Sequence, residues 1–441
     1  MEPTPAGDRL EQLARTRGYL GLLGAAGLVG VPVSVAAFAF LALLHWLTDL
    51  VWVELPHQWG LDPVPWWWPA PWLAAGGLIV ALAITRLPGA GGHVPIDGLG
   101  AGAVAPSHLP GVLLAAVGGL PLGVVLGPEA PLMAVGAGLA VLLSRRWGPA
   151  EGTPASGMIG VAGSAAAVAV IFGSPLIAAV FILEAVGFSG PRLTRVVLPC
   201  LLSAGVGALV FTGMGAWTGL PVASLTLPGL ESPARPDLAD LLWTVPAAVL
   251  VAAGISQVHR LGHALAPRAA ARPALLALVA VAVTAVGAAA YALLTGRSPV
   301  EVLLSGQDTL GVLTAGGDVP GAWALVALLV CKGLAYAVSL AALRGGPIFP
   351  ALFMGAAVGV LLGALPGYGT APAMAAGMAA ATAAVLPLPV SSAVLVTLLL
   401  GSDATGMTPV VLVAVVIAFV TGRLLERPRA AGDAAPEPAE A

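Results

Sequence analysis

Residues 127–143 read G-P-E-A-P-L-M-A-V-G-A-G-L-A-V-L-L, and residues 346–362 read G-P-I-F-P-A-L-F-M-G-A-A-V-G-V-L-L. The two stretches share one skeleton, because eight positions carry the same residue at the same spacing. The matching pairs are Gly127 and Gly346, Pro128 and Pro347, Pro131 and Pro350, Gly136 and Gly355, Ala137 and Ala356, Val141 and Val360, Leu142 and Leu361, and Leu143 and Leu362. Such a match between two distant stretches indicates an internal duplication.

The composition indicates an integral membrane protein. Of the 441 residues, 59% are hydrophobic and only 9% are charged, and the mean hydropathy is +0.98. That leaves too little polar surface to cover a water-soluble domain of this size. Several apolar runs reach the ~20 residues that span a bilayer as a helix, whereas the runs at 131–143 and 351–362 are too short and predict helices that end inside the protein. We therefore expect an all-α, polytopic membrane protein with broken and re-entrant helices.

The duplication divides the chain into two homologous halves. Paired halves with short, Gly- and Pro-interrupted segments at corresponding positions are typical of transporters whose binding site lies between the repeats. An odd number of spans in each half makes the repeats inverted. The expected segments are a cytoplasmic N-terminal segment (1–17), a first membrane repeat (18–218), a connector (219–240), a second membrane repeat (241–425) and a disordered cytoplasmic tail (426–441).

The distribution of charge predicts the location of the protein and excludes some partners. Arginines flank the apolar region at both ends, which places both termini in the cytoplasm by the positive-inside rule. The first apolar run is too long for a cleaved signal peptide. A net charge of -3 without a basic surface gives no support for nucleic-acid binding. We expect a multi-pass protein of the bacterial inner (plasma) membrane, surrounded by lipids and without a cofactor or metal ion.

Glu129 is the residue that the sequence singles out for function. It is a lone carboxylate deep in an apolar region, where an ionisable group is costly and is by default a candidate functional residue. Removal from water favours its protonated form, so that protonation becomes accessible near neutral pH. The alternative is a carboxylate that only caps the adjacent helix.

The ligand predicted for this region is an anion. Helices that begin near 128–132 and 347–351 direct unpaired N–H groups and the positive ends of their dipoles toward one point between the halves. A cation would instead require oxygen ligands, and the second copy carries Ile348 and Phe349 where the first carries Glu129 and Ala130.

At these motifs the sequence resembles the CLC family of chloride channels and proton/chloride exchangers. The family motif G-x-E-G-P is similar to G-P-E-A-P at 127–131, and G-G-x-F-x-P-x-L-x-x-G is similar to G-G-P-I-F-P-A-L-F-M-G at 345–355. The motif G-S-G-I-P is similar to G-G-H-V-P at 91–95, and A-P-L-x-x-x-x-F-x-x-E is similar to residues 174–184. The resemblance covers nearly the entire chain and implies a homodimer, an anion as substrate, and Glu129 as the gate and proton acceptor.

The resemblance also implies a set of anion-binding residues, with departures. The family's central serine corresponds to Gly92, and His93 beside it is either a pathway residue or an ordinary loop histidine. The family's phenylalanine, whose amide faces the anion, corresponds to Ile348. Pro347 beside it has no N–H to offer. The implied anion-binding residues are Gly92, His93, Gly127, Pro128, Ala130, Ile348 and Phe349.

Three further residues belong to the implied pathway. Exchangers of the family carry an internal proton-transfer glutamate one residue after the position of Glu184, where this sequence has Ala185. Glu184 is then either a displaced relay or a structural residue. Lys332 matches a basic position of the family and either biases the inner vestibule toward anions or snorkels at a helix end.

The sequence therefore predicts transmembrane transport of chloride, channel-like or weakly proton-coupled, gated by a protonatable glutamate. The alternatives are a proton-coupled antiporter and a transporter of another anion such as fluoride. A less favoured alternative is an intramembrane enzyme, for which neither G-x-S-x-G nor H-E-x-x-H is present.

Overall fold

The computed structural model describes residues 16–100, 104–146, 149, 151–186, 191–219, 236–307, 309–314, 319–401 and 404–425. Within these ranges the chain consists of helices and loops, and Gly127 and Gly346 form an isolated antiparallel bridge. Most of the predicted N-terminal segment, most of the connector and the predicted tail lie outside the described residues.

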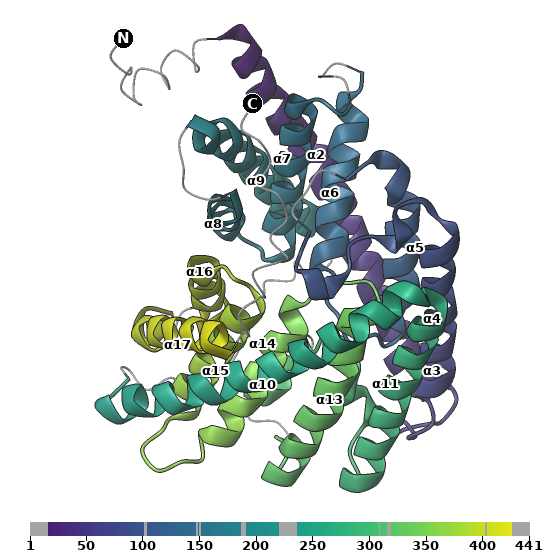
Figure 1. Ribbon diagram of the computed structural model, residues 1–441, viewed down its shortest axis with the longest axis vertical. Coiled ribbons are helices and arrows are strands. Elements are labelled where there is room, and N and C mark those ends of the chain that lie inside the picture. Colours follow the sequence, from purple (N-terminus) through teal and green to yellow (C-terminus); the bar gives the residue numbers. More distant parts are fainter. Residues whose placement is uncertain are drawn as a thin grey trace.

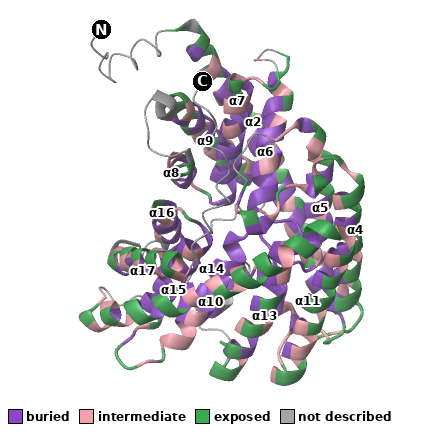
Figure 2. Cartoon of the chain, viewed as in Figure 1, coloured by how far each residue is buried: buried purple, intermediate pink, exposed green. Residues whose placement is uncertain are grey.

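Eight helical segments in the described part are long and apolar enough to cross a membrane. Their outward faces are largely exposed (Figure 2). They carry aliphatic side chains, including Leu28, Leu209 and Val286, which are 65%, 77% and 69% exposed. Such faces suit lipid and not water. The segments are α2 (Arg17–Asp49), continued by η1 (Leu50–Glu54) and α3 (Leu55–Gln58), then α4 (Pro69–Arg86), α7 (Pro154–Ile171), α9 (Pro191–Thr218), α10 (Leu238–Ala271), α11 (Pro273–Thr295), α13 (Ala322–Ala342) and α17 (Ala404–Leu425).

Shorter apolar helices lie among these long ones. The runs predicted at 131–143 and 351–362 form the greater part of α6 and α14, both of which begin at buried residues inside the protein. The short helices are α5 (Leu109–Gly119), α6 (Glu129–Ser144), α8 (Pro175–Val186), α14 (Ile348–Leu362), α15 (Thr370–Val385) and α16 (Pro389–Leu399), and α12 (Leu310–Thr314) is a single turn.

The two halves repeat one packing arrangement. Helix α2 packs against α7 and α9, as α10 packs against α15 and α17. Helix α6 packs against α7 as α14 packs against α15, so that helices far apart in the sequence occupy equivalent places (Figure 1). The molecule is thus an all-helical membrane fold of two repeats. The start of α6 in the first repeat meets the start of α14 in the second at the antiparallel bridge.

Matched glycines explain why the duplicated skeleton is needed for packing. A Cβ on Gly136 of α6 would lie 2.6 Å from the carbonyl oxygen of Gly163 in α7. A Cβ on Gly355 of α14 would lie 2.2 Å from the carbonyl oxygen of Gly377 in α15. Backbones this close exclude any larger residue, which is the usual role of small residues between membrane helices.

One boundary differs from the prediction. Helix α10 begins at Leu238, inside the segment assigned to the connector. Asp237 and Asp240 form a reciprocal capping box there, in which each side chain accepts from the other residue's N–H at 2.9 Å. This local signal starts the helix before its apolar run does.

Candidate functional site

The first turns of α6 and α14 are joined through the two matched glycines. The N–H of Gly127 donates to the carbonyl of Gly346 at 2.7 Å, and the N–H of Gly346 donates to the carbonyl of Gly127 at 2.5 Å. Both helices start within two residues of this bridge, at Glu129 and Ile348. Their N-terminal N–H groups and positive dipole ends therefore lie close together, which favours negative charge at this point.

The carboxylate of Glu129 lies at this point. The residue is only 1% exposed, and its Oε1 accepts a hydrogen bond from the backbone N–H of Phe349 at 2.8 Å. Its Oε2 is buried without a hydrogen-bond partner. A carboxylate from the first half thus sits on the N-terminus of a helix of the second half. This position would also suit a small anion.

The two bridge glycines leave the space that the carboxylate occupies. A Cβ on Gly127 would lie 2.1 Å from Oε2 of Glu129, and a Cβ on Gly346 would lie 1.7 Å from it. Neither position therefore tolerates a side chain while the carboxylate stays there. The glycine match between the repeats has a direct role at the site.

Tyr336 contacts the start of α14, and Arg344 lies two residues before Gly346; neither residue was singled out from the sequence. Tyr336 of α13 is fully buried, and its hydroxyl donates to the carbonyl of Pro347 at 2.6 Å. Arg344 directly precedes Gly345 and Gly346, and its Nε donates to the carbonyl of Ala90 at 2.9 Å. The signal available in the sequence was weak: a tyrosine and an arginine shortly before the G-G-P motif, in a largely apolar run.

The loop with Gly92 and His93 approaches the site through Arg344 and not through its own side chains. The backbone of Gly92 has a φ of 105°, a conformation that favours glycine. His93 is exposed, and its ring lies against Gly100. These contacts are those of a loop histidine.

Glu184 lies at another interface between the halves. Its Oε1 accepts from the N–H of Val390 at 2.9 Å, and its Oε2 accepts from the N–H of Ser391 at 2.7 Å. Both oxygens therefore cap the N-terminus of α16. Ala185, the next residue, is exposed.

Lys332 is fully buried in α13, away from a helix end. Its Nζ donates to the carbonyls of Glu301, Val302, Leu303 and Leu304 at 2.8–3.3 Å. It thereby holds the end of the 3₁₀-helix η6 (Pro299–Val302) and the two residues that follow it. Neither cavity described below has Lys332 in its lining.

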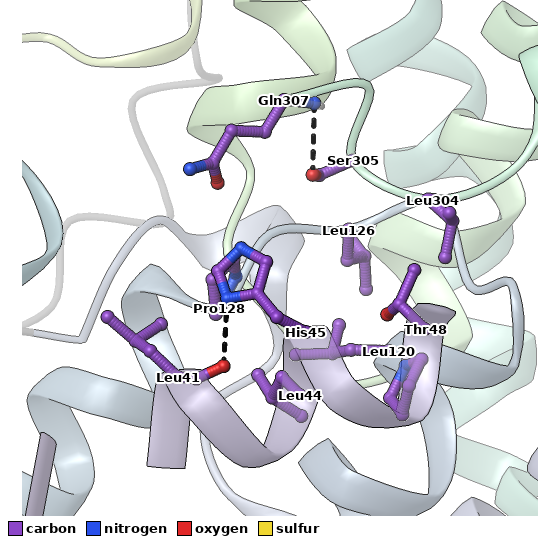
Figure 3. A pocket seen from close by; sticks show the side chains of 11 residues that line it. Leu41, Leu44, His45, Thr48, Leu120, Leu126, Pro128, Leu304, Ser305 and Gln307 are labelled. Atoms are coloured by element: carbon purple, nitrogen blue, oxygen red, sulfur yellow. Dashed lines mark hydrogen bonds between the residues drawn. The ribbon is translucent and has the colours of Figure 1, made fainter. Parts of the chain in front are cut away.

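Two cavities approach the Glu129 site. The first, here the Pro128 cavity, has a volume of about 50 Å³, and Figure 3 shows His45, Gln307 and Pro128 around it. The second, the Pro347 cavity, has a volume of about 470 Å³ and is lined by Pro347 and by residues of α10, α15 and α17. Because Pro128 precedes Glu129 and Pro347 precedes Ile348, each cavity ends next to one of the two helix N-termini.

The comparisons with known proteins identify relatives. Residues 76–423 match the family described as "Voltage gated chloride channel". The protein described as "Putative ion-transport protein YfeO" from Salmonella paratyphi A is 30% identical over 360 residues, which are 79% of this chain and 82% of the relative. The corresponding protein of Salmonella newport matches to the same extent.

Solved structures share the fold at low identity. A slow cyanobacterial Cl⁻/H⁺ antiporter superimposes with a TM-score of 0.73 at 17% identity, over 92% of this chain and 95% of the other. A CLC-type fluoride/proton antiporter superimposes with a TM-score of 0.69 at 15% identity, over 91% and 95%. At these identities the likeness concerns the fold alone.

Proposed function

Because the chain belongs to the voltage gated chloride channel family, the CLC family, whose members transport anions and are not enzymes, we propose that it moves chloride through a path closed by Glu129. The observation that carries the proposal is the hydrogen bond from the N–H of Phe349 to Oε1 of Glu129. It puts a negatively charged group of one repeat where the helix N-terminus of the other would hold an anion.

The proposed gate works by competition. The ionised carboxylate and a chloride ion both need the N–H groups and the positive dipole end of α14. Protonation removes the negative charge of the carboxylate and with it the advantage over chloride. The proposed open state is therefore favoured at low pH. The backbones of Gly127, Ala130, Ile348 and Phe349 surround the proposed anion position, with Pro128 at the start of α6.

The proposed path runs from the Pro128 cavity past Glu129 to the Pro347 cavity. We assign the Pro347 cavity to the cytoplasmic side, because the basic residues Arg260 and Arg423 lie at the end of α17 that borders it. On this assignment the end of α17 is cytoplasmic, and we propose the same side for the N-terminus from the arginines that precede α2. Lys332 fixes the loop at Leu304, which lines the Pro128 cavity, and so shapes that mouth.

Proton coupling in this proposal is weak or absent. The inner position that carries a glutamate in exchangers of the family is Ala185. Both oxygens of Glu184 beside it accept hydrogen bonds from N–H groups at the start of α16. We propose a homodimer with one path in each subunit, as the family implies. A proton-coupled antiporter of chloride or fluoride is the alternative, since solved structures of both kinds share the fold.

The test is Glu129→Gln in proteoliposomes. Glutamine imitates the protonated carboxyl group. We therefore expect chloride efflux at pH 7.5 to rise by roughly tenfold toward the low-pH rate of the parent, because a competition equivalent to one pKa unit changes anion occupancy by a factor of ten. Proton movement is recorded in the same vesicles, and chloride, nitrate and fluoride are compared. Glu54→Gln, at an exposed carboxylate of η1, is the matched control and keeps the parent's rates.

Three results would contradict the proposal. A Glu129→Gln protein that folds normally and keeps the parent's low efflux at pH 7.5 would place the gate elsewhere. A chloride gradient that drives stoichiometric uphill proton movement in the parent would establish the antiporter, and a preference for fluoride would replace chloride as the substrate.

A further inference from the structure

Lys332 is the only lysine of the chain, and its ammonium group lies among backbone oxygens. Its Nζ is 2.8–3.3 Å from the carbonyl oxygens of residues 301–304. The ring of Phe353 in α14 covers another side, with its centroid 4.8 Å from Nζ, which is a cation–π contact. An ammonium has three N–H donors, so four surrounding oxygens resemble the coordination shell of a cation. These carbonyls and the ring are here called the carbonyl cage.

No carboxylate forms an ion pair with Lys332 in the described part of the chain. Glu301 contributes its backbone carbonyl to the cage, but its Oε1 accepts from Nε of Arg297 at 3.0 Å and its Oε2 accepts from the hydroxyl of Tyr291. A buried charge is normally paired with an opposite charge. The direct contacts of this ammonium are instead carbonyl dipoles and an aromatic face, and rings of carbonyls are what potassium channels use to hold an ion.

The distances in the cage indicate which class of cation it fits. Magnesium and calcium ions take oxygen ligands at about 2.0–2.6 Å. The oxygens around Nζ are farther away, at 2.8–3.3 Å. The cage therefore suits a large monovalent cation, such as ammonium or potassium, and not a divalent one.

The caged segment continues into the wall of the Pro128 cavity. Leu304, Ser305 and Gln307 line this cavity beside Pro128, which precedes Glu129 (Figure 3). Leu304 has a φ of 59°, a conformation that residues with a side chain rarely adopt. The cavity has a volume of only about 50 Å³, so a small movement of this segment is enough to close it. The cage is thus placed to fix the shape of the mouth that leads to Glu129.

We propose that the carbonyl cage is a binding site for a monovalent cation, that the ammonium of Lys332 fills it as a tethered ion, and that this ion holds the Pro128 cavity open for the anion. The last part rests on the function proposed above. Lys332 is then a positioning residue, which acts on the anion through the segment at Leu304. A free ammonium or potassium ion should replace it when the tether is shortened.

Lys332→Met tests the proposal, because methionine matches the lysine side chain as far as Cε and lacks only Nζ. With sodium as the cation, chloride efflux from proteoliposomes should fall on the order of tenfold, because the empty cage leaves buried carbonyls without a donor and releases the segment. Ammonium or potassium in place of sodium should restore efflux to within about twofold of the parent, because both fit a ring of carbonyls. Lys332→Arg should stay impaired, since a planar guanidinium keeps the charge but cannot occupy a single point among four oxygens.

The matched control is Arg86→Met, which removes an exposed cation in the last turn of α4. It should keep the parent's efflux and should not respond to the exchange of sodium for ammonium. Thermal unfolding of the Lys332→Met protein in detergent gives a second measurement, in which ammonium should raise the unfolding temperature and sodium should not.

A measurement on the parent protein covers variants that fold poorly. Because the chain has a single lysine, isotope-labelled lysine gives one side-chain amine signal, and a caged ammonium should exchange its protons slowly and resist acylating reagents. The inference is overturned if this amine exchanges and reacts like an exposed one, if Lys332→Arg equals the parent, or if ammonium and potassium restore nothing to Lys332→Met. Failure of the proposed function appears separately, as a parent protein without chloride efflux, and thermal unfolding then still tests the cation site.

Discussion

The carboxylate of Glu129 lies where a side chain at Gly346 would have to go. A Cβ there would be 1.7 Å from Oε2, and a Cβ on Gly127 would be 2.1 Å from the same atom. The contact partner is the far end of a flexible side chain, so a larger residue at either glycine displaces the carboxylate before it disturbs the backbone. A substitution at either glycine can therefore move the carboxylate of Glu129 without changing the chemistry of the proposed gate.

Gly346→Ala should hold Glu129 away from the N-terminus of α14. We expect chloride efflux at pH 7.5 to rise at least about threefold and the dependence on pH between about 4 and 7 to flatten, because the carboxylate no longer competes at the site. Efflux from proteoliposomes over this pH range measures both effects.

The control for Gly346→Ala is Gly254→Ala, because nothing lies within 4 Å of a Cβ built on Gly254. Combining Gly346→Ala with Glu129→Gln should add little to the flattening that each causes alone, since contacting residues are coupled. Independent, additive effects of the two substitutions would refute the idea that the methyl group acts through the carboxylate.

At the scale of elements, two carboxylates of the first half reach the N-termini of two helices of the second half. Glu184 satisfies two N–H groups of α16 with its two oxygens. Glu129 receives one hydrogen bond at α14 and leaves Oε2 without a partner. The first contact uses both oxygens of the carboxylate, whereas the second uses only one, as the proposed exchange with an anion requires.

Glu184→Ala should therefore affect stability and not gating. Loss of two charge-assisted bonds to a helix N-terminus costs about 1–2 kcal/mol, which lowers the unfolding temperature by roughly 1–2 °C in a chain of 441 residues. Thermal unfolding in mild detergent measures the loss, and Glu184→Gln should recover part of it, because its amide oxygen can still accept from one of the two N–H groups. Unchanged stability together with altered proton movement would instead assign Glu184 to a proton path.

At the scale of the whole molecule, two halves with one packing arrangement carry unequal chemistry. Gly136 on Gly163 repeats as Gly355 on Gly377, and α6 on α7 repeats as α14 on α15. Glu129, however, corresponds to Ile348 of the second half. The repeated scaffold brings two helix N-termini together. Because only the first half carries a carboxylate at this position, the first half alone supplies the proposed gate.

The proposed homodimer is a prediction about the whole molecule. In mild detergent we expect a protein mass twice the 43.5 kDa of one chain, because the family implies two subunits with one path each. Light scattering on the size-separated protein measures the mass after subtraction of the detergent. A single-chain mass at all concentrations, with no cross-linked pair in native membranes, would exclude the dimer.

The sequence by itself determined the membrane class, the duplication and the short helices, because composition, spacing and the length of apolar runs are local properties. It also singled out Glu129, since a lone carboxylate in an apolar run is conspicuous without coordinates. The family followed from motifs in order along the chain, and the match over residues 76–423 confirms it.

Only the tertiary structure decided which groups meet. The N–H of Phe349 lies 220 residues from Glu129 in sequence, and the hydroxyl of Tyr336 finds Pro347 because α13 packs behind α14. Lys332 binds four carbonyls of a loop about thirty residues earlier, a contact that no spacing rule reveals. The physical reason is that hydrogen bonds in a membrane interior must be satisfied by protein groups, and which groups are within reach depends on how the two halves pack.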